Sequence, residues 1–232
     1  MTEIKNHLRQ PVGESLPAWT ARLRPEPITI KGRTVHVDPL NPARHARALF
    51  AAFAEDATGA GWTYLPYGPF ESNAAFDAWL ESAAVKSDPL FFAIVPNGAS
   101  PAGLAALQRV DTANGVVEVG NVRFAPSLSR SAAATEAMYL LMRHIFDDLG
   151  YRRYEWKCDS LNAASRAAAE RLGFRFEGLF RQAIVYKGRN RDTAWYSVVD
   201  REWPALKARF GRWLAPGNFD DSGNQRRRLR DV

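Results

Sequence analysis

Apolar residues recur along the chain with two spacings, one that predicts strands and one that predicts helices. Short alternating runs flank Lys31-Gly32-Arg33, which is typical of a hairpin. Three further runs predict an antiparallel meander, because Asn-Gly pairs stand between them as turn signals. These runs are Phe91–Val95, Ala102–Val110 and Val116–Phe124, with Asn97-Gly98 and Asn114-Gly115 between them.

Apolar positions three and four residues apart predict helices between and after these strands. One helix begins after Asn41-Pro42, an N-cap followed by proline. Further helices are expected from Ser72 or Asn73, over 131–149, over 163–172 and after Pro204, and further strands at Tyr154–Cys158, 174–187 and 194–199. This order of elements predicts a mixed α/β (α+β) fold with one mixed sheet and helices on both faces.

The composition is that of a folded domain with neither a disulfide framework nor a metal site. The chain has 232 residues, 46% of them hydrophobic, which suffices for one sizeable core. Its single cysteine and four scattered histidines form no disulfide and no metal-binding pair. No apolar run reaches the roughly 20 residues that cross a bilayer, and the N-terminus resembles no signal peptide. We therefore expect a cytoplasmic protein that does not enter the membrane.

Three segments are expected within this chain. Residues 1–25 are polar and show no sustained periodicity, so we expect an N-terminal extension there. The regular pattern fills 26–200, and 201–232 hold a last helix and a basic tail.

Arginine dominates the charge of the chain. The formal net charge is +6 with 31 lysines and arginines, and only six of these are lysines. Arginine binds phosphate with two parallel hydrogen bonds, so a phosphorylated ligand, a nucleic acid or an acidic partner fits this charge. Four arginines crowd the last seven residues. The simpler interpretation of this tail is a solvated, frayed chain end.

The first stretch with chemical meaning joins the strand 116–124 to the long helix. Ser127–Ala132 is rich in small residues, and the free N–H groups of a helix N-terminus attract anions. Small residues let a phosphate approach the backbone at Ser129, Ser131, Ala132 and Ala133, and Arg130 adds a positive charge. The alternative is an ordinary serine-capped helix start.

Two further stretches offer polar groups. Asn162 stands where an N-cap is expected, and Ser165 falls in the first turn of the helix that follows. The loop 61–70 contains Trp62, Tyr64 and Tyr67 among apolar rings, and we interpret these three as candidate substrate contacts. The alternative for this aromatic loop is that it plugs one edge of the core.

Several of these segments together resemble the GNAT superfamily, in its ribosomal-protein N-terminal acetyltransferase branch. The similarity rests on Ala-Ala-Ala-Thr-Glu-Ala at 132–137, Asn-Ala-Ala-Ser-Arg at 162–166 and Arg-Leu-Gly-Phe-Arg-Phe-Glu-Gly at 171–178. It covers roughly residues 26–200, and the order of the last two motifs makes it specific. The family pattern has glycine at the position of Arg130, so this loop departs from it.

The resemblance implies a mostly antiparallel sheet whose fourth and fifth main strands splay apart around acetyl-coenzyme A (acetyl-CoA). Strand 116–124 and strand 154–158 take these places. Carried over to this sequence, the implied cofactor contacts are Asn121, Val122, Arg123, Phe124, Ser129, Arg130, Ser131, Ala132, Ala133, Ala134, Asn162 and Ser165.

Acetyl transfer to an amine needs a proton acceptor and benefits from a proton donor. Glu118 on the cleft-lining strand is the first choice for the base, and the alternative is a strand residue paired with an arginine. Ala169 replaces the tyrosine that many members use as the acid, so Ser165, or Tyr139 and Tyr154, remain candidates. Cys158 and His144 fit structural roles better, because neither has a catalytic neighbour in sequence.

Three functions therefore compete. The first is an N-acetyltransferase acting on a small-molecule amine or a peptide N-terminus. The second is a non-catalytic acyl-CoA-binding or regulatory protein on the same fold, which the missing tyrosine and Arg130 favour. The third, a nucleic-acid-binding module, ranks last because no aromatic-basic strand motif accompanies the tail. The family includes monomers and dimers, so a homodimer stays open.

Overall fold

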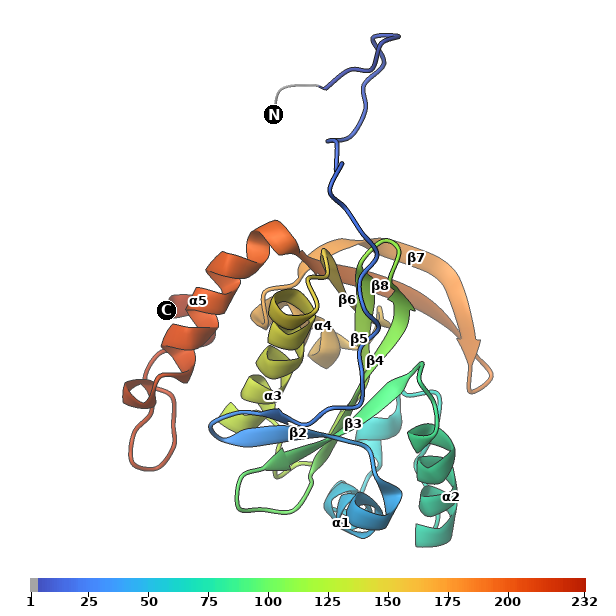
Figure 1. Cartoon of the computed structure of the whole chain (residues 1–232). Helices are drawn as coiled ribbons and strands as arrows, with labels where there is room; N and C mark the ends of the chain where they lie inside the picture. The colour runs from blue at the N-terminus through green and yellow to red at the C-terminus, as the bar shows by residue number, and fades with distance from the viewer. Residues whose placement is uncertain (1–3) are drawn as a thin grey trace.

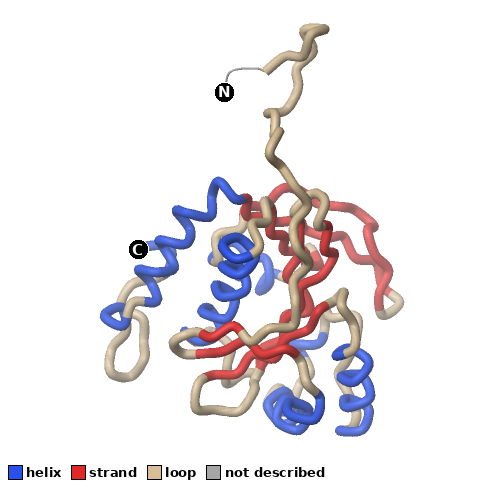
Figure 2. Tube along the Cα trace, viewed as in Figure 1, coloured by secondary structure: helices blue, strands red, loops and turns tan. Residues whose placement is uncertain are grey.

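The computed structural model describes residues 4–232, which form one eight-stranded sheet with helices on both faces (Figures 1 and 2). The strands are β1 Ile30–Lys31, β2 Val35–Pro39, β3 Leu90–Pro96, β4 Gly103–Asp111, β5 Val116–Phe124, β6 Arg153–Asp159, β7 Arg175–Tyr186 and β8 Arg189–Val199. Their order across the sheet is β1-β2-β3-β4-β5-β6-β8-β7. Among the described strands, β5 and β6 alone pair in parallel. The expected mixed, mostly antiparallel sheet is confirmed.

Five α-helices accompany the sheet: α1 Pro42–Ala54, α2 Asn73–Ala84, α3 Ala132–Arg143, α4 Ala163–Arg171 and α5 Trp203–Leu214. A π-helical turn, His144–Asp148, continues α3. The first four helices begin at caps, because a side-chain oxygen of Asn41, Ser72, Ser131 or Asn162 accepts the N–H three residues further on. The sequence signals for the helix starts are therefore confirmed.

The helices divide between the two faces of the sheet (Figure 1). The α4 residue Ser165 accepts a hydrogen bond from Trp156 Nε1 of β6 at 2.9 Å, so α4 covers that face together with α3 and α5. On the opposite face, the Arg123 guanidinium of β5 lies 5.1 Å from the ring centre of Phe53 in α1. Helix α2 packs beside α1 on this second face. Helices thus pack on both faces of the sheet, whereas the outermost strand β7 stays largely exposed.

The ladder between β5 and β6 is short. It pairs four positions, from Val116 with Arg153 to Val119 with Trp156, and then stops. The remaining residues of both strands, 120–124 and 157–159, have no ladder partner across this gap. This confirms the expected splay of two neighbouring strands.

A β-bulge interrupts β5 beside this gap. Ala106 pairs with Gly120 and Leu104 with Arg123, so three steps along β5 oppose two along β4. Asn121 has a φ of 52°, in the left-handed region that asparagine tolerates better than most residues. Residues 121 and 122 are consequently unpaired in the ladders on both sides of β5.

The two ends of the described chain differ. The N-terminal segment projects away from the domain and reaches it near Trp19, whose Nε1 donates to Ala113 O at 2.8 Å (Figure 2). The C-terminal tail is anchored, since Leu229 is 1% exposed. The side chain of Asn218 also donates to Arg227 O and accepts from Arg227 N. The expectation of a frayed tail is therefore wrong. The tail packs against α5 through the buried Leu229 and through the hydrogen bonds of the Asn218 side chain.

Candidate active site

One cleft of about 1640 Å³ occupies the gap between β5 and β6 and reaches both faces of the sheet. On one face it is lined by the start of α3 and by α4, and on the other by loop 60–67 and the middle of β4. Among the residues that the sequence singled out, those lining this cleft are Tyr64, Tyr67, Glu118, Asn121, Val122, Arg123, Phe124, Ser129, Arg130, Ser131, Ala132, Ala134, Asn162 and Ser165. The structure thus gathers most of the predicted site around one cavity, from segments up to about a hundred residues apart, whereas Trp62 and Ala133 do not line it.

The loop before α3 offers backbone donors to this cleft. Ser131 Oγ accepts the N–H of Ala134, whereas the N–H groups of Ala132 and Ala133 have no hydrogen-bond partner among the described residues. Arg130 has a φ of 63°, so it adopts the left-handed conformation that suits glycine. The loop therefore keeps a glycine-like path despite the substitution, at a conformational cost.

Arg123 lines the cleft, but its guanidinium is engaged by other groups of the protein. The side chain is 6% exposed, forms an ion pair with Asp56 at 2.9 Å and donates to Phe124 O. Its guanidinium also lies 5.0 Å from the centre of the Trp62 ring. Burial lowers the pKa of Arg123, and the N–H of Gly61 is the main cause that lowers the pKa of Asp56. This geometry removes the Arg123 side chain from the expected cofactor contacts.

The aromatic loop has both of the roles considered for it. Trp62 is 4% exposed, packs on Phe53 and does not line the cleft, so it plugs the core. Tyr64 and Tyr67 do line the cleft, and the Tyr67 hydroxyl donates to Asn121 Oδ1 at 3.0 Å. Burial raises the pKa of Tyr67, so this hydroxyl remains a donor.

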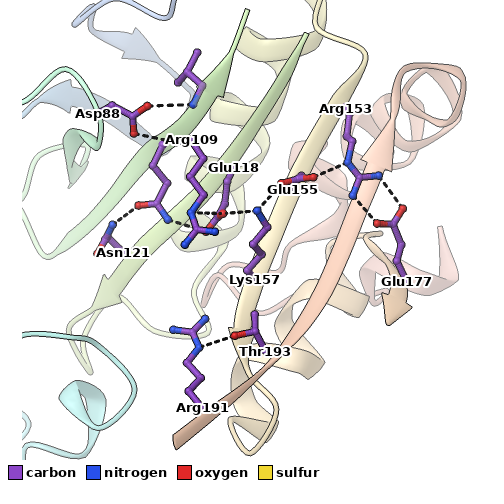
Figure 3. Close-up of polar contacts among 12 residues, drawn as sticks. Asp88, Arg109, Glu118, Asn121, Arg153, Glu155, Lys157, Glu177, Arg191 and Thr193 are labelled. Carbon is purple, nitrogen blue, oxygen red and sulfur yellow. Dashed lines mark hydrogen bonds and ion pairs between the residues drawn. The ribbon is translucent and has the colours of Figure 1, made fainter. Parts of the chain in front are cut away.

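Glu118 is buried, at 3% exposure, and its carboxylate faces the cleft. Gln108 Nε2 donates to Oε1 at 2.7 Å, and Lys157 Nζ lies 3.0 Å from Oε2 as an ion pair (Figure 3). Arg109 Nε is 3.5 Å from the same oxygen. The alternative interpretation, in which Glu118 is a strand residue paired with an arginine, thus agrees with the structure, and Lys157 forms a second ion pair with it.

Lys157 links Glu118 to a row of alternating charges across the sheet (Figure 3). Its ammonium is 2.8 Å from Glu155, which in turn lies 2.6 Å from Arg153. Arg153 pairs with Glu177 on β7 and with Glu155 on β6. Because each charge has a neighbour of opposite sign, the row satisfies its buried members and fixes the place of Glu118.

Three carboxylates line the cleft, and Glu118 differs from the other two. Both oxygens of Asp88 accept backbone N–H groups, from Arg109 and Val110. Asp159 is also fully engaged, with Leu161 N on one oxygen and the Tyr186 hydroxyl on the other. Glu118 Oε2 makes no hydrogen bond in the described structure. Glu118 is therefore the one carboxylate of the three with an oxygen held by ion pairs, to Lys157 and Arg109, and by no hydrogen bond among the described residues.

Ser165 lies next to two groups of β6. Its Oγ accepts from Trp156 Nε1 at 2.9 Å, which leaves its own hydrogen free to donate. Burial raises the pKa of the Cys158 thiol, and a hydrogen bond from Ser165 offsets part of that rise. The thiol is thus in its unreactive form, which disfavours a nucleophilic role for Cys158.

The other candidates for a proton donor lie elsewhere. Tyr139 stacks on Trp203 and Phe210, and Tyr154 is fully buried with an unpartnered hydroxyl. Neither tyrosine lines the cleft. His144 pairs with Asp148 at 2.8 Å, outside the cleft. Ser165 alone of these candidates reaches the site.

Sequence analysis missed several polar residues of the cleft, among them Lys157, Tyr186 and Arg171. Lys157 alternates with the apolar residues Trp156 and Cys158 in β6, and this period-two pattern was an available signal. Arg171 Nη2 donates to Thr135 Oγ1 at 2.8 Å beside α3, and burial lowers its pKa. Its position depends on how α3 and α4 pack, so no local pattern identifies it.

Two features are absent from residues 4–232. No helix there is long and apolar enough to span a bilayer. The same residues contain no group of three or more His, Cys, Asp or Glu side chains that could hold a metal ion.

A parallel strand pair that splays beside a helix N-terminus, within a mostly antiparallel sheet, defines the class of this protein. A family model for the acetyltransferase (GNAT) domain matches residues 35–175, more than half of the chain. The chain belongs to this family. The resemblance seen in the sequence is confirmed.

Known relatives agree with this assignment. The crystal structure of a GCN5-related N-acetyltransferase from Brucella melitensis is 50% identical with a TM-score of 0.91, over 93% of this chain and 98% of that one. A GNAT-family structure from Chromobacterium violaceum is 43% identical with a TM-score of 0.78, over 84% and 98% of the two chains. YdaF of Bacillus subtilis, a candidate ribosomal N-acetyltransferase, is 31% identical over 105 residues. That match spans 45% of this chain and 57% of YdaF.

Proposed function

We propose that this protein transfers the acetyl group of acetyl-CoA to a primary amine, on a small molecule or at a peptide N-terminus. Direct attack within a ternary complex accounts for the site without a covalent intermediate, because holding both substrates in line already lowers the barrier. The observation that carries the proposal is the end of the β5–β6 ladder in the same cleft as the unpaired N–H groups of α3. Membership of the acetyltransferase family supports it.

The residues present fit a ligand that bears a diphosphate. The N–H groups of Ala132 and Ala133 have no partner, and they stand at the positive end of the α3 dipole. Arg130 and Arg171 line this end of the cleft, and neither forms an ion pair with a carboxylate of the described chain. These groups would hold the diphosphate, while Asn162 and Ser165 would contact the cofactor arm.

Acetyl-CoA, when bound, supplies an activated thioester. Asn121 and Val122 belong to no ladder pair on either side of β5, so their backbone N–H groups would be the donors that stabilise a developing oxyanion. Glu118 Oε2 accepts the proton of the attacking amine. The Ser165 hydroxyl, which lies beside the Cys158 sulfur, would turn to donate a hydrogen bond to the departing thiolate, and the thiolate would take its proton from water. Tyr64 and Tyr67 border the opening through which the amine arrives.

The test is a screen for release of free coenzyme from acetyl-CoA with amino acids, polyamines, aminoglycosides and N-terminal peptides. Turnover with one class supports the proposal and identifies the acceptor. Heat of binding with acetyl-CoA but no release from any amine would indicate the alternative, a binding or regulatory protein. Absence of binding as well would overturn both.

A further inference from the structure

The C-terminal segment is a built part of the domain. Asn218 is 8% exposed, and its Nδ2 donates to Trp213 O at 2.9 Å at the end of α5. The same side chain holds Arg227, and Leu229 is buried. Residues 216–232 are thereby folded back along α5 (Figure 1).

This folding brings a loop to the cleft at the end where α3 begins. Phe219 and Gln225 close the loop through an isolated β-bridge. The Asp220 carboxylate accepts the N–H groups of Ser222 and Asn224 inside it. The residues of this segment that line the cleft are Trp213, Phe219, Gly223, Asn224 and Gln225. The loop is therefore a fixed wall of the cavity and not a solvated end.

This wall presents aromatic rings and side-chain amide groups to the cleft. The rings of Trp213 and Phe219 are 5.2 Å apart and meet edge to face. Trp213 Nε1 donates to Gln225 Oε1 at 2.9 Å, which leaves the Gln225 amide hydrogens free to donate. Trp213 is 3% exposed, so the partly buried Phe219 ring supplies the apolar surface, and this ring beside free amide groups suits a planar heterocycle such as adenine.

Arg226 adds a positive charge immediately beside the lining residues. Its only side-chain hydrogen bond in the described structure runs from Nε to Phe219 O, at 3.4 Å. The Asp220 carboxylate, which interacts electrostatically with Arg226, accepts backbone N–H groups within its own loop, and these hydrogen bonds lower its pKa. The terminal amino groups of Arg226 are consequently available to an anion, in the fork geometry that suits phosphate.

We infer that the loop Phe219–Gln225 and Arg226 form the subsite for the nucleotide end of coenzyme A, with Arg226 binding the ribose 3′-phosphate. The inference rests on the proposed function, which brings the diphosphate to residues 129–134 of the same cleft. It assigns a role to the first arginine of the basic tail that an acetyl-transfer mechanism does not use.

Titration calorimetry with coenzyme A and with 3′-dephospho-coenzyme A tests this assignment. The wild-type protein is expected to bind coenzyme A about tenfold more tightly than the dephospho form. In Arg226→Ala the two ligands should bind with equal affinity, and the affinity for dephospho-coenzyme A should stay at the wild-type value. The control is Arg201→Ala, which loses the same charge just before the start of α5, a helix about 18 Å long whose far end carries the C-terminal segment.

Each result has one meaning. Equal affinity of the wild-type protein for both ligands, or an unchanged preference in Arg226→Ala, overturns the subsite. Loss of the preference in Arg171→Ala but not in Arg226→Ala assigns the 3′-phosphate to Arg171 and likewise overturns it. Absence of heat with either ligand contradicts the proposed function itself. Thermal melting of each variant shows that the fold is retained.

Discussion

The Lys157 ammonium and the Glu118 carboxylate lie 3.0 Å apart and join β6 to β5 at the point where their backbone ladder stops. The last ladder pair is Val119 with Trp156, so Glu118 precedes this pair and Lys157 follows it. A side-chain ion pair therefore continues the connection between the strands where hydrogen bonds between the main chains end. The ion pair also places the Glu118 carboxylate at the end of the cleft where the two strands begin to separate.

Replacing Glu118 with glutamine should lower kcat about a hundredfold or more while leaving the KM for acetyl-CoA unchanged. Glutamine keeps the size of the side chain and its contact with Gln108, but it cannot accept the proton of the amine. Steady-state kinetics with the best acceptor of the screen measure this.

Glu155→Gln is the matched control, because it also removes a carboxylate from Lys157 without altering the lining of the cleft. An equal loss in both variants would mean that Lys157, and not proton transfer to Glu118, limits the reaction.

Arg130→Gly should raise the free energy of unfolding by up to about 1 kcal/mol, since glycine adopts a φ of 63° without the cost that a side chain carries. The same change should weaken coenzyme binding several-fold, because a cation is lost beside the diphosphate. Urea denaturation and calorimetry measure the two effects.

Arg130→Lys separates charge from conformation. It keeps the strain and the charge, so stability should stay at the wild-type value and binding should fall less than in the glycine variant. A glycine variant less stable than the wild type would show that contacts of the arginine side chain outweigh its strain.

Ser165→Ala should reduce kcat several-fold, because the departing thiolate loses the hydrogen bond that this hydroxyl would donate. It also removes the acceptor of Trp156 Nε1, which should cost about 1–3 kcal/mol of stability. Ser165→Thr keeps the hydroxyl and serves as the control. A kcat that is unaffected in the alanine variant would mean that the thiolate departs without a donor.

Asp56→Asn should destabilise the protein by about 3 kcal/mol at neutral pH, because it leaves the buried Arg123 guanidinium without its ion pair. The pKa of Asp56 is lowered below its ordinary value of 3.8, chiefly by the N–H of Gly61. A carboxyl of this kind contributes its full stability above that value and loses it as the pH falls through the lowered pKa.

The stability difference between wild type and Asp56→Asn should therefore be constant above about pH 5 and shrink below 3.8. Urea denaturation across this range tests the sign. A difference that grows on acidification would contradict the direction of the pKa shift.

Local signals were sufficient for most of the fold. The caps Asn41, Ser72 and Asn162 determine helix starts through hydrogen bonds that span three residues, so their effect can be recognised in a short window. The Asn114-Gly115 turn likewise fixes the meander between β4 and β5, with Gly115 at a φ of 61°.

The contacts that position the site span long distances along the chain. Arg123 and Asp56 are 67 positions apart, and Tyr64 reaches Leu161 O across 97. No pattern in either segment identifies its partner, since the pairing is decided by how the aromatic loop packs on α1 and the sheet. The anchoring of the tail by the buried Leu229 could not be predicted locally either. A single leucine among arginines gives no sign of burial until the packing surface of α5 is known.

The bulge at Asn121 makes the length of β5 as important as its composition. Since side chains alternate between the faces of a strand, removing one residue there would restore strict alternation and send every later side chain to the opposite face. The Arg123 side chain would then point to the other face of the sheet and lose its ion pair with Asp56. Phe124 would turn to the face that Arg123 now occupies. Homologous strands should consequently accept many single replacements at these positions, whereas insertions and deletions within 120–123 should be eliminated by selection.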